Sequence, residues 1–89
     1  MKLIFRKTFL KDIKKIKDPK VARKIEQIII ELKEVEFLEE LPNFKKMKGY
    51  SIAYRIRVGD YRMGIYKISK DELEIIRFLK REDIYKVFP

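Results

Sequence analysis

Residues 51–68, SIAYRIRVGDYRMGIYKI, decide the fold, because apolar and polar side chains alternate on both sides of one Gly-Asp pair. Alternation with a period of two is typical of a β-strand that buries one face. A Gly-Asp pair between two such runs favours a two-residue hairpin loop with glycine at its first central position. We therefore predict strands over residues 51–58 and 61–68, joined by Gly59 and Asp60.

Before this hairpin, the spacing of the apolar residues is mostly helical. Residues 2–7 indicate a short first strand, and the apolar residues between 9 and 16 predict a helix of about two turns. Asp18 and Pro19 favour the start of a second helix, as its N-cap and its first helical residue. The apolar stripe of this longer helix consists of Val21, Ile25, Ile28, Leu32 and Val35. Two helices joined by so short a break predict a helical hairpin.

After the helices, residues 39–49 lack any periodicity and are interpreted as a connector, and residues 73–79 predict a last strand. The resulting order is β-α-α-β-β-β. We expect an α+β fold in which an antiparallel sheet carries the helical hairpin on one face. The 89 residues are expected to form a single domain.

The composition excludes several kinds of chemistry. The chain has neither cysteine nor histidine, so disulfides, thiol catalysis and an imidazole base are excluded, and zinc sites of the usual kind with them. The acidic residues follow no recurring ligand pattern, and no metal or other cofactor is expected. No apolar run is long enough to span a bilayer, and MKLIFRK is unlike a signal peptide. We expect a cytoplasmic protein.

The positive charge is unevenly distributed. The formal net charge is +9, and residues 45–67 hold seven Lys and Arg residues against Asp60 alone, a local balance of +6. A lysine-rich surface that only faces solvent would have its charges more evenly mixed. The concentration in one segment favours a polyanionic partner, because each neutralised phosphate releases a counterion.

The hairpin register gathers this charge on one face. If Gly59 and Asp60 form the loop, Arg57 lies opposite Arg62 and Arg55 lies opposite Gly64, which would leave space beside Arg55. Tyr66 is expected further along this face. The other face is expected to be apolar, with Ile52, Tyr54, Ile56, Val58, Tyr61, Met63 and Ile65. Like charges opposite one another destabilise a strand pair, so the arginine cluster is either a solvated face or a functional surface for RNA phosphates.

Several stretches resemble the RelE/ParE toxin superfamily over essentially the whole chain. They are Met47-Lys48-Gly49, YRIRVGDYR at residues 54–62, Tyr66, and LKREDIY at residues 79–85. The last stretch is similar to the C-terminal signature of the RelE-type members. The order of the expected elements also agrees with the RelE-like fold.

The resemblance implies a toxin of a type II toxin–antitoxin system that cleaves mRNA in the ribosomal A site. In such toxins the ribose 2′-OH attacks the adjacent phosphate without a metal ion, and translation stops. The implied catalytic residues are Arg55, Arg57, Arg62, Arg81 and Tyr85. Arg62 would stabilise the phosphate and Tyr85 would stack on a base. The lysines expected to contact RNA are Lys45, Lys46, Lys48 and Lys80.

Arg55 and Arg57 stand where well-known members have two lysines, which leaves the general base open. Arginine stabilises anions but exchanges protons poorly, because its pKa lies above about 12. Tyr85, Lys80 and an arginine assisted by the substrate are the candidates for proton acceptor. Tyr85 has a second interpretation, as a residue that packs the C-terminal segment on the sheet.

Two other functions fit the sequence. A ParE-like toxin would have the same fold but would inhibit DNA gyrase without cutting RNA, and a non-catalytic basic module would only bind RNA or DNA. ParE-type chains generally lack the arginine and tyrosine ending seen here, which favours the RelE type. Either kind of toxin is expected to bind an acidic antitoxin, through contacts that weaken with salt.

Overall fold

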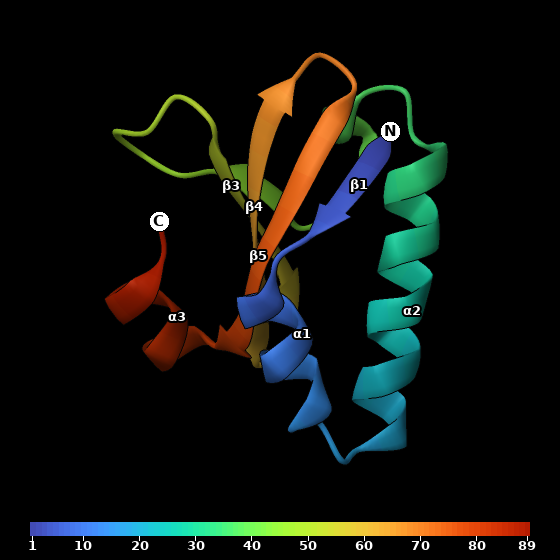
Figure 1. Cartoon of the computed structure of the whole chain (residues 1–89), viewed down its shortest axis with the longest axis vertical. Coiled ribbons are helices and arrows are strands. Elements are labelled where there is room, and N and C mark those ends of the chain that lie inside the picture. Colours follow the sequence, from blue (N-terminus) through green and yellow to red (C-terminus); the bar gives the residue numbers. More distant parts are fainter.

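In the computed structural model of residues 1–89, a five-stranded sheet lies between a helical hairpin and a short C-terminal helix (Figure 1). The elements in chain order are β1 (Lys2–Phe5), α1 (Lys7–Lys14), α2 (Pro19–Glu34), a 3-10 turn (Leu38–Glu40), β2 (Phe44–Lys46), β3 (Ala53–Val58), β4 (Tyr61–Ser69), β5 (Glu72–Lys80) and α3 (Arg81–Val87). The strands lie in the order β1-β5-β4-β3-β2. This arrangement confirms the predicted α+β fold with a helical hairpin on one face.

The sheet differs from the prediction at both of its edges. β1 runs parallel to β5, so the sheet is only mostly antiparallel. Alternation within a strand carries no information on the direction of its neighbour, so the sequence pattern does not predict this pairing. At the other edge, β2 lies inside the predicted connector. Its three residues are too few to establish a period.

The central hairpin has the predicted register. Val58 pairs with Tyr61, Arg57 with Arg62 and Arg55 with Gly64. Gly59 has a φ of 59° at the first central position, the left-handed conformation that glycine adopts without a steric penalty. β3 begins at Ala53, two residues later than predicted, and Ile52 is 45% exposed rather than part of the apolar face.

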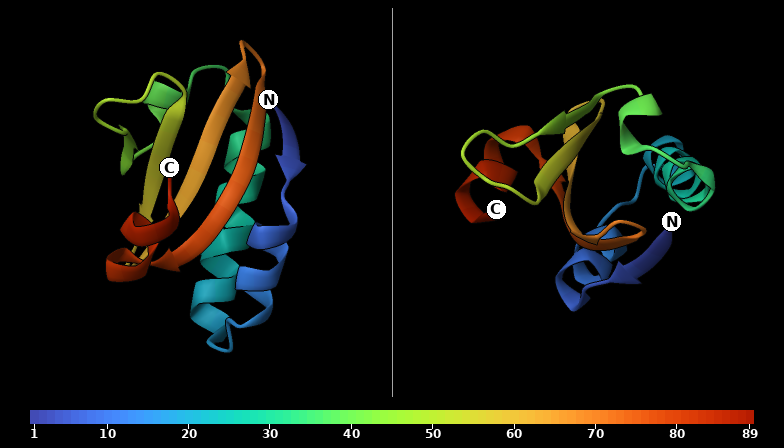
Figure 2. Two further views of the ribbon diagram at one scale, coloured as in Figure 1. Left: turned by 60° about the vertical axis from the view of Figure 1, so that its left-hand side comes forward. Right: turned by 90° about the horizontal axis from the view of Figure 1, so that it is seen from above.

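The main core fills the space between the sheet and the helical hairpin (Figure 2). Asp18 caps α2 as expected, because its carboxylate accepts a hydrogen bond from Lys20 N at 2.9 Å and Pro19 follows it. The fully or nearly fully buried side chains of this core are Phe9, Ile25, Leu32, Leu38, Ile56, Val58, Met63, Ile65, Leu73, Ile75 and Phe78. None of the helices combines the length and the hydropathy that crossing a membrane requires.

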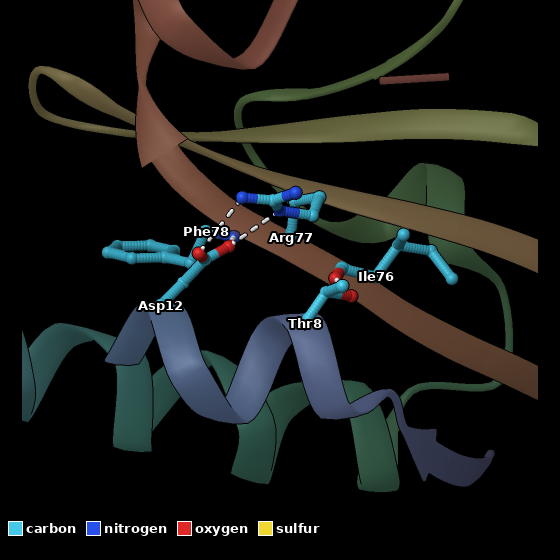
Figure 3. Close-up of polar contacts among 5 residues, drawn as sticks. All are labelled: Thr8, Asp12, Ile76, Arg77 and Phe78. Atoms are coloured by element: carbon cyan, nitrogen blue, oxygen red, sulfur yellow. Dashed lines mark hydrogen bonds and ion pairs between the residues drawn. The ribbon is translucent and has the colours of Figure 1, made fainter. Parts of the chain in front are cut away.

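Side chains of α1 complete the edge of β5 where β1 ends (Figure 3). β1 pairs with β5 only as far as Ile75, so the following residues of β5, which pair with β4 on one side, have no strand partner on the other side. The Thr8 hydroxyl donates to Ile76 O at 2.6 Å, and the Asp12 carboxylate accepts from Phe78 N at 2.9 Å. Residues four apart lie on one side of a helix, so α1 presents both groups to the strand.

Asp12 also anchors a charged side chain. Its carboxylate accepts hydrogen bonds from Arg77 Nε at 2.9 Å and from Arg77 Nη2 at 3.1 Å, a two-pronged ion pair, and Asp12 is only 4% exposed. Together with the bond from Phe78 N, three donors converge on one carboxylate. This contact fixes the end of β5 from which α3 departs.

A second, smaller core lies on the opposite face of the sheet, under α3 (Figure 2). It consists of Ala53, Ile76, Ile84 and Phe88, with Met47, Tyr66 and Leu79 packed against it. The prediction contained no helix here, because seven residues give too short a period to recognise. The face that the sequence assigns to the arginines is therefore partly covered by apolar side chains.

Candidate active site

The arginine face is built by β3 and β4. Ile56 and Met63 belong to the main core, so Arg55, Arg57 and Arg62, at the alternating positions, project toward the side of the sheet that carries α3. The backbone N–H of Arg81 donates to Asp60 O at 2.9 Å, which ties the start of α3 to the hairpin loop. The first turn of α3 thus lies at the same end of the hairpin as Arg57 and Arg62.

None of these arginines is neutralised by a carboxylate. The ion pairs of the molecule join Arg6 to Glu74, Arg77 to Asp12 and Lys86 to Asp83. Arg55, Arg57, Arg62 and Arg81 take part in none of them. Their positive charge therefore stays available to an anion outside the protein, as a phosphate-binding surface requires.

Arg62 is placed differently from its two neighbours. It is only 9% exposed, and its Nη1 donates to Gly59 O and Tyr61 O, both at 2.9 Å. Its Nε is buried without a partner. Arg62 lies opposite Arg57 as the register predicts, but its guanidinium is not presented to solvent, because it folds back onto the carbonyl groups of its own turn.

Arg55 and Arg57 converge instead on Asn43, the residue before β2. Arg55 Nη1 donates to Asn43 O at 3.1 Å, and Arg57 Nη2 donates to Asn43 Oδ1 at 3.2 Å. The sequence prediction did not include Asn43. The one available signal was the Pro-Asn pair at residues 42–43, which favours a turn in which asparagine tolerates a positive φ.

The space predicted beside Arg55 is filled. A Cβ added to Gly64 would lie 2.9 Å from atoms of the Phe88 ring, and the same ring stacks on Tyr66 with 5.3 Å between centroids. Gly64 therefore allows Phe88, the residue after α3, to lie directly on the backbone of β4. The expectation of an open space at Gly64 is wrong, because a residue distant in sequence occupies it.

Replacing Gly64 by alanine is expected to lower the free energy of unfolding by about 1–3 kcal/mol, the usual range for an overpacked site. The new methyl group would push Phe88 off the sheet and loosen α3. Chemical denaturation of Gly64→Ala measures this cost. In a Phe88→Ala background the ring is absent and the cost should shrink; an equal cost in both backgrounds would contradict the proposed clash.

α3 presents Arg81 and Tyr85 to solvent. Ile84 and Phe88 are 1% and 3% exposed and provide the packing of the helix, whereas Tyr85 is 48% exposed. The alternative in which Tyr85 packs the C-terminal segment on the sheet is therefore wrong. Its ring is free to stack on another planar group.

The predicted RNA-binding lysines are divided between the two faces of the sheet. Lys45 shares the arginine face, whereas Lys46 and Lys80 lie opposite Tyr54 and Tyr61, on the face toward the helical hairpin. Lys46, the last residue of β2, and Lys48, in the loop after it, border an open hollow formed by residues 46–51. No group of three or more acidic side chains with the spacing of a metal site is present.

Comparisons with known proteins agree with this architecture. The model of a family described as the ParE toxin of the type II toxin–antitoxin system parDE matches residues 3–85. The chain is 42% identical to toxin RelE3 of Methanocaldococcus jannaschii over 90 residues, which covers 100% of both proteins.

The chain is also similar to solved toxin structures. A chain of the RelB–RelE antitoxin–toxin complex from Methanococcus jannaschii superposes with a TM-score of 0.80 at 40% identity, covering 97% of this chain and 99% of that one. A chain of the intact E. coli RelBE complex gives a TM-score of 0.69 at 24% identity, over 89% and 94% of the two chains, and supports the fold alone.

The chain thus belongs to the RelE/ParE superfamily of toxins from type II toxin–antitoxin systems. Within this superfamily it is a RelE-family toxin, because the full-length relative and the structure with the higher TM-score are both of the RelE kind.

Proposed function

We propose that this toxin is a ribosome-dependent endoribonuclease that cleaves mRNA in the A site without a metal ion. The observation that carries the proposal is the set of unpaired arginines around one hairpin, with Arg81 and Tyr85 added by α3. An anionic substrate backbone supplies the countercharge that the protein does not. The choice of mRNA as the substrate follows from the resemblance to RelE-type toxins, to which the similar toxin RelE3 belongs by name.

In the proposed reaction the ribose 2′-oxygen forms a bond to the adjacent phosphorus while the bond from phosphorus to the 5′-oxygen breaks. The 2′-OH proton passes to a base, and the leaving 5′-oxygen gains a proton. Arg55, Arg57 and Arg81 stabilise the extra negative charge of the crowded phosphate, which is where preorganised cations have the largest effect. Tyr85 stacks on a base of the mRNA and aligns the nucleotide.

Arg62 is proposed to contact the phosphate after a local rearrangement of its side chain. Its Nη1 is held by two turn carbonyls and its Nε lacks a partner, so a phosphate would satisfy a buried donor that the protein leaves open.

The residue that accepts the 2′-OH proton is Tyr85, Lys80 or an arginine assisted by the substrate. Lys45, Lys46, Lys48 and Lys80 are proposed to contact mRNA or ribosomal RNA.

The proposed physiological setting is the cytoplasm, with an acidic antitoxin as inhibitor. Both of the similar solved structures described above are complexes with the antitoxin RelB. An acidic antitoxin segment would neutralise the same arginines that RNA needs, so binding of antitoxin and of RNA would exclude each other.

The second candidate is a ParE-like toxin that inhibits DNA gyrase, and it is favoured by the family model that matches residues 3–85. An assay with programmed ribosomes separates the two. Defined cuts in the A-site codon, with the 2′,3′-cyclic phosphate and 5′-OH ends that attack by the 2′-oxygen leaves, are expected from the purified toxin. Inhibition of gyrase supercoiling without RNA cleavage would support the ParE alternative, and binding of nucleic acid without either activity would support a non-catalytic module.

A further inference from the structure

Asn43 accepts three hydrogen bonds from two arginines of the candidate site. Its carbonyl oxygen accepts from the backbone N–H of Arg57 at 3.0 Å and from Arg55 Nη1 at 3.1 Å. Its side-chain Oδ1 accepts from Arg57 Nη2 at 3.2 Å. Guanidinium groups only donate, so the side-chain atom that faces Arg57 is necessarily the oxygen. One residue thus restrains both side chains.

The backbone of Asn43 is adapted to this contact. Its φ is 63°, and it is the one residue other than glycine with a positive φ. This conformation costs energy for most side chains but less for asparagine. It occurs at the residue before β2, directly before the β2–β3 pairing begins at Phe44. Non-glycine residues in such conformations concentrate at functional sites.

The chemistry of the amide is the third part of the argument. An aspartate at this position would hold the guanidinium groups more strongly, but its charge would neutralise part of the arginine face. A neutral oxygen orients Arg57 and leaves its full charge for a phosphate. The Arg57 side chain is exposed, and the Asn43 side chain is the only side chain with which it forms a hydrogen bond. Without the Asn43 side chain, the guanidinium would sample several rotamers.

We propose that Asn43 is a positioning residue for RNA cleavage, which holds Arg55 and Arg57 in one orientation without neutralising them. The inference rests on the proposed function for its catalytic meaning. Its structural content, the restraint of Arg57 by the Asn43 side chain, stands independently of that function.

Two variants separate orientation from charge. Asn43→Gly is compatible with the left-handed backbone and both carbonyl contacts, and it removes the side chain with its Oδ1 contact to Arg57. It should lower the single-turnover cleavage rate about tenfold, as misplaced catalytic groups do, with less than about a twofold change in Kd for a short single-stranded RNA. Asn43→Asp should instead weaken RNA binding and reduce the dependence of log Kd on log salt by about 0.7, the value for one lost phosphate contact on a single strand.

A double-mutant cycle with Arg57→Ala provides the control. If Asn43 acts by orienting Arg57, Asn43→Gly should have little further effect on the cleavage rate once Arg57 is gone. Equal effects of Asn43→Gly in both backgrounds, or an unchanged rate in the single variant, would overturn the inference while wild-type cleavage upheld the proposed function.

A measurement that does not depend on catalysis tests the restraint of Arg57 even if the wild-type toxin cuts no RNA and the proposed function fails. The NMR signals of the Arg57 guanidinium should show restricted rotation in the wild-type protein and faster rotation in Asn43→Gly. Identical rotation in the two proteins would show that Asn43 does not restrain Arg57, whatever the activity.

Discussion

Replacing Arg81 by alanine is expected to lower the rate of ribosome-dependent cleavage by at least about a hundredfold, the usual loss when one preorganised charge-stabilising group is removed. Arg81 is exposed, and its side chain forms neither an ion pair nor a hydrogen bond; its backbone N–H donates to Asp60 O. The free energy of unfolding should therefore change by no more than about 0.5 kcal/mol. Single-turnover cleavage on programmed ribosomes and chemical denaturation measure the two quantities.

Arg23→Ala is the matched control, because Arg23 is also exposed and helical but lies on α2, away from the arginine face. It removes the same charge and should leave cleavage within about twofold, since loss of long-range attraction alone is a small effect at physiological salt. Arg81→Lys should keep part of the activity. Full cleavage by Arg81→Ala, or an equal loss in Arg23→Ala, would remove Arg81 from the proposed site.

Arg62→Ala is a less specific experiment than the sequence suggested. The role that the resemblance implies for Arg62, stabilisation of the phosphate, would be lost in this variant without an effect on folding. In the structure, however, the guanidinium donates to two turn carbonyls, and both would lose a partner. The variant should therefore lose stability as well as activity, about 1–3 kcal/mol if the carbonyl groups stay dry. Its loss of toxicity alone would not distinguish catalysis from folding.

The sequence predicted the parts of the fold that local chemistry determines. Gly59 and Asp60 set the loop, the loop set the register, and the register placed Arg57 opposite Arg62. Asp18 and Pro19 likewise marked the start of α2. In each case the controlling residues are neighbours in the chain, so their preferences can be read without knowledge of the tertiary structure.

The errors arise where distant segments meet. The alternation of apolar and polar residues predicted the face of the sheet on which Arg62 lies. It did not predict that the guanidinium turns back and donates to Gly59 O. Phe88, which covers Gly64, lies 24 residues later in the chain, and no residue near Gly64 in the sequence indicates this contact. The parallel pairing of β1 with β5 and the short elements β2 and α3 depend on the same long-range packing. Tertiary contacts override local pattern at such places.

The role of Asp12 also depends on contacts between distant segments, so the sequence did not indicate it. Its replacement is expected to have the largest effect on stability. In the sequence it is one polar residue on the first helix; in the structure it accepts from Phe78 N and twice from Arg77 while only 4% exposed (Figure 3). Asp12→Ala should lower the free energy of unfolding by about 3–5 kcal/mol, because it leaves a half-buried guanidinium and a buried N–H without partners. That is a large part of the total for a small domain.

Asp18→Ala is the matched control for Asp12→Ala, because it also removes a carboxylate that accepts from a backbone N–H, but at the exposed start of α2. Loss of such a cap costs about 1 kcal/mol. Chemical denaturation of both variants and of Asp12→Ala/Arg77→Ala measures the difference. The double variant should regain part of the loss, because the unpaired guanidinium is then gone. An Asp12→Ala cost no greater than that of Asp18→Ala would mean that α1 does not secure the strand from which α3, with Arg81 and Tyr85, departs.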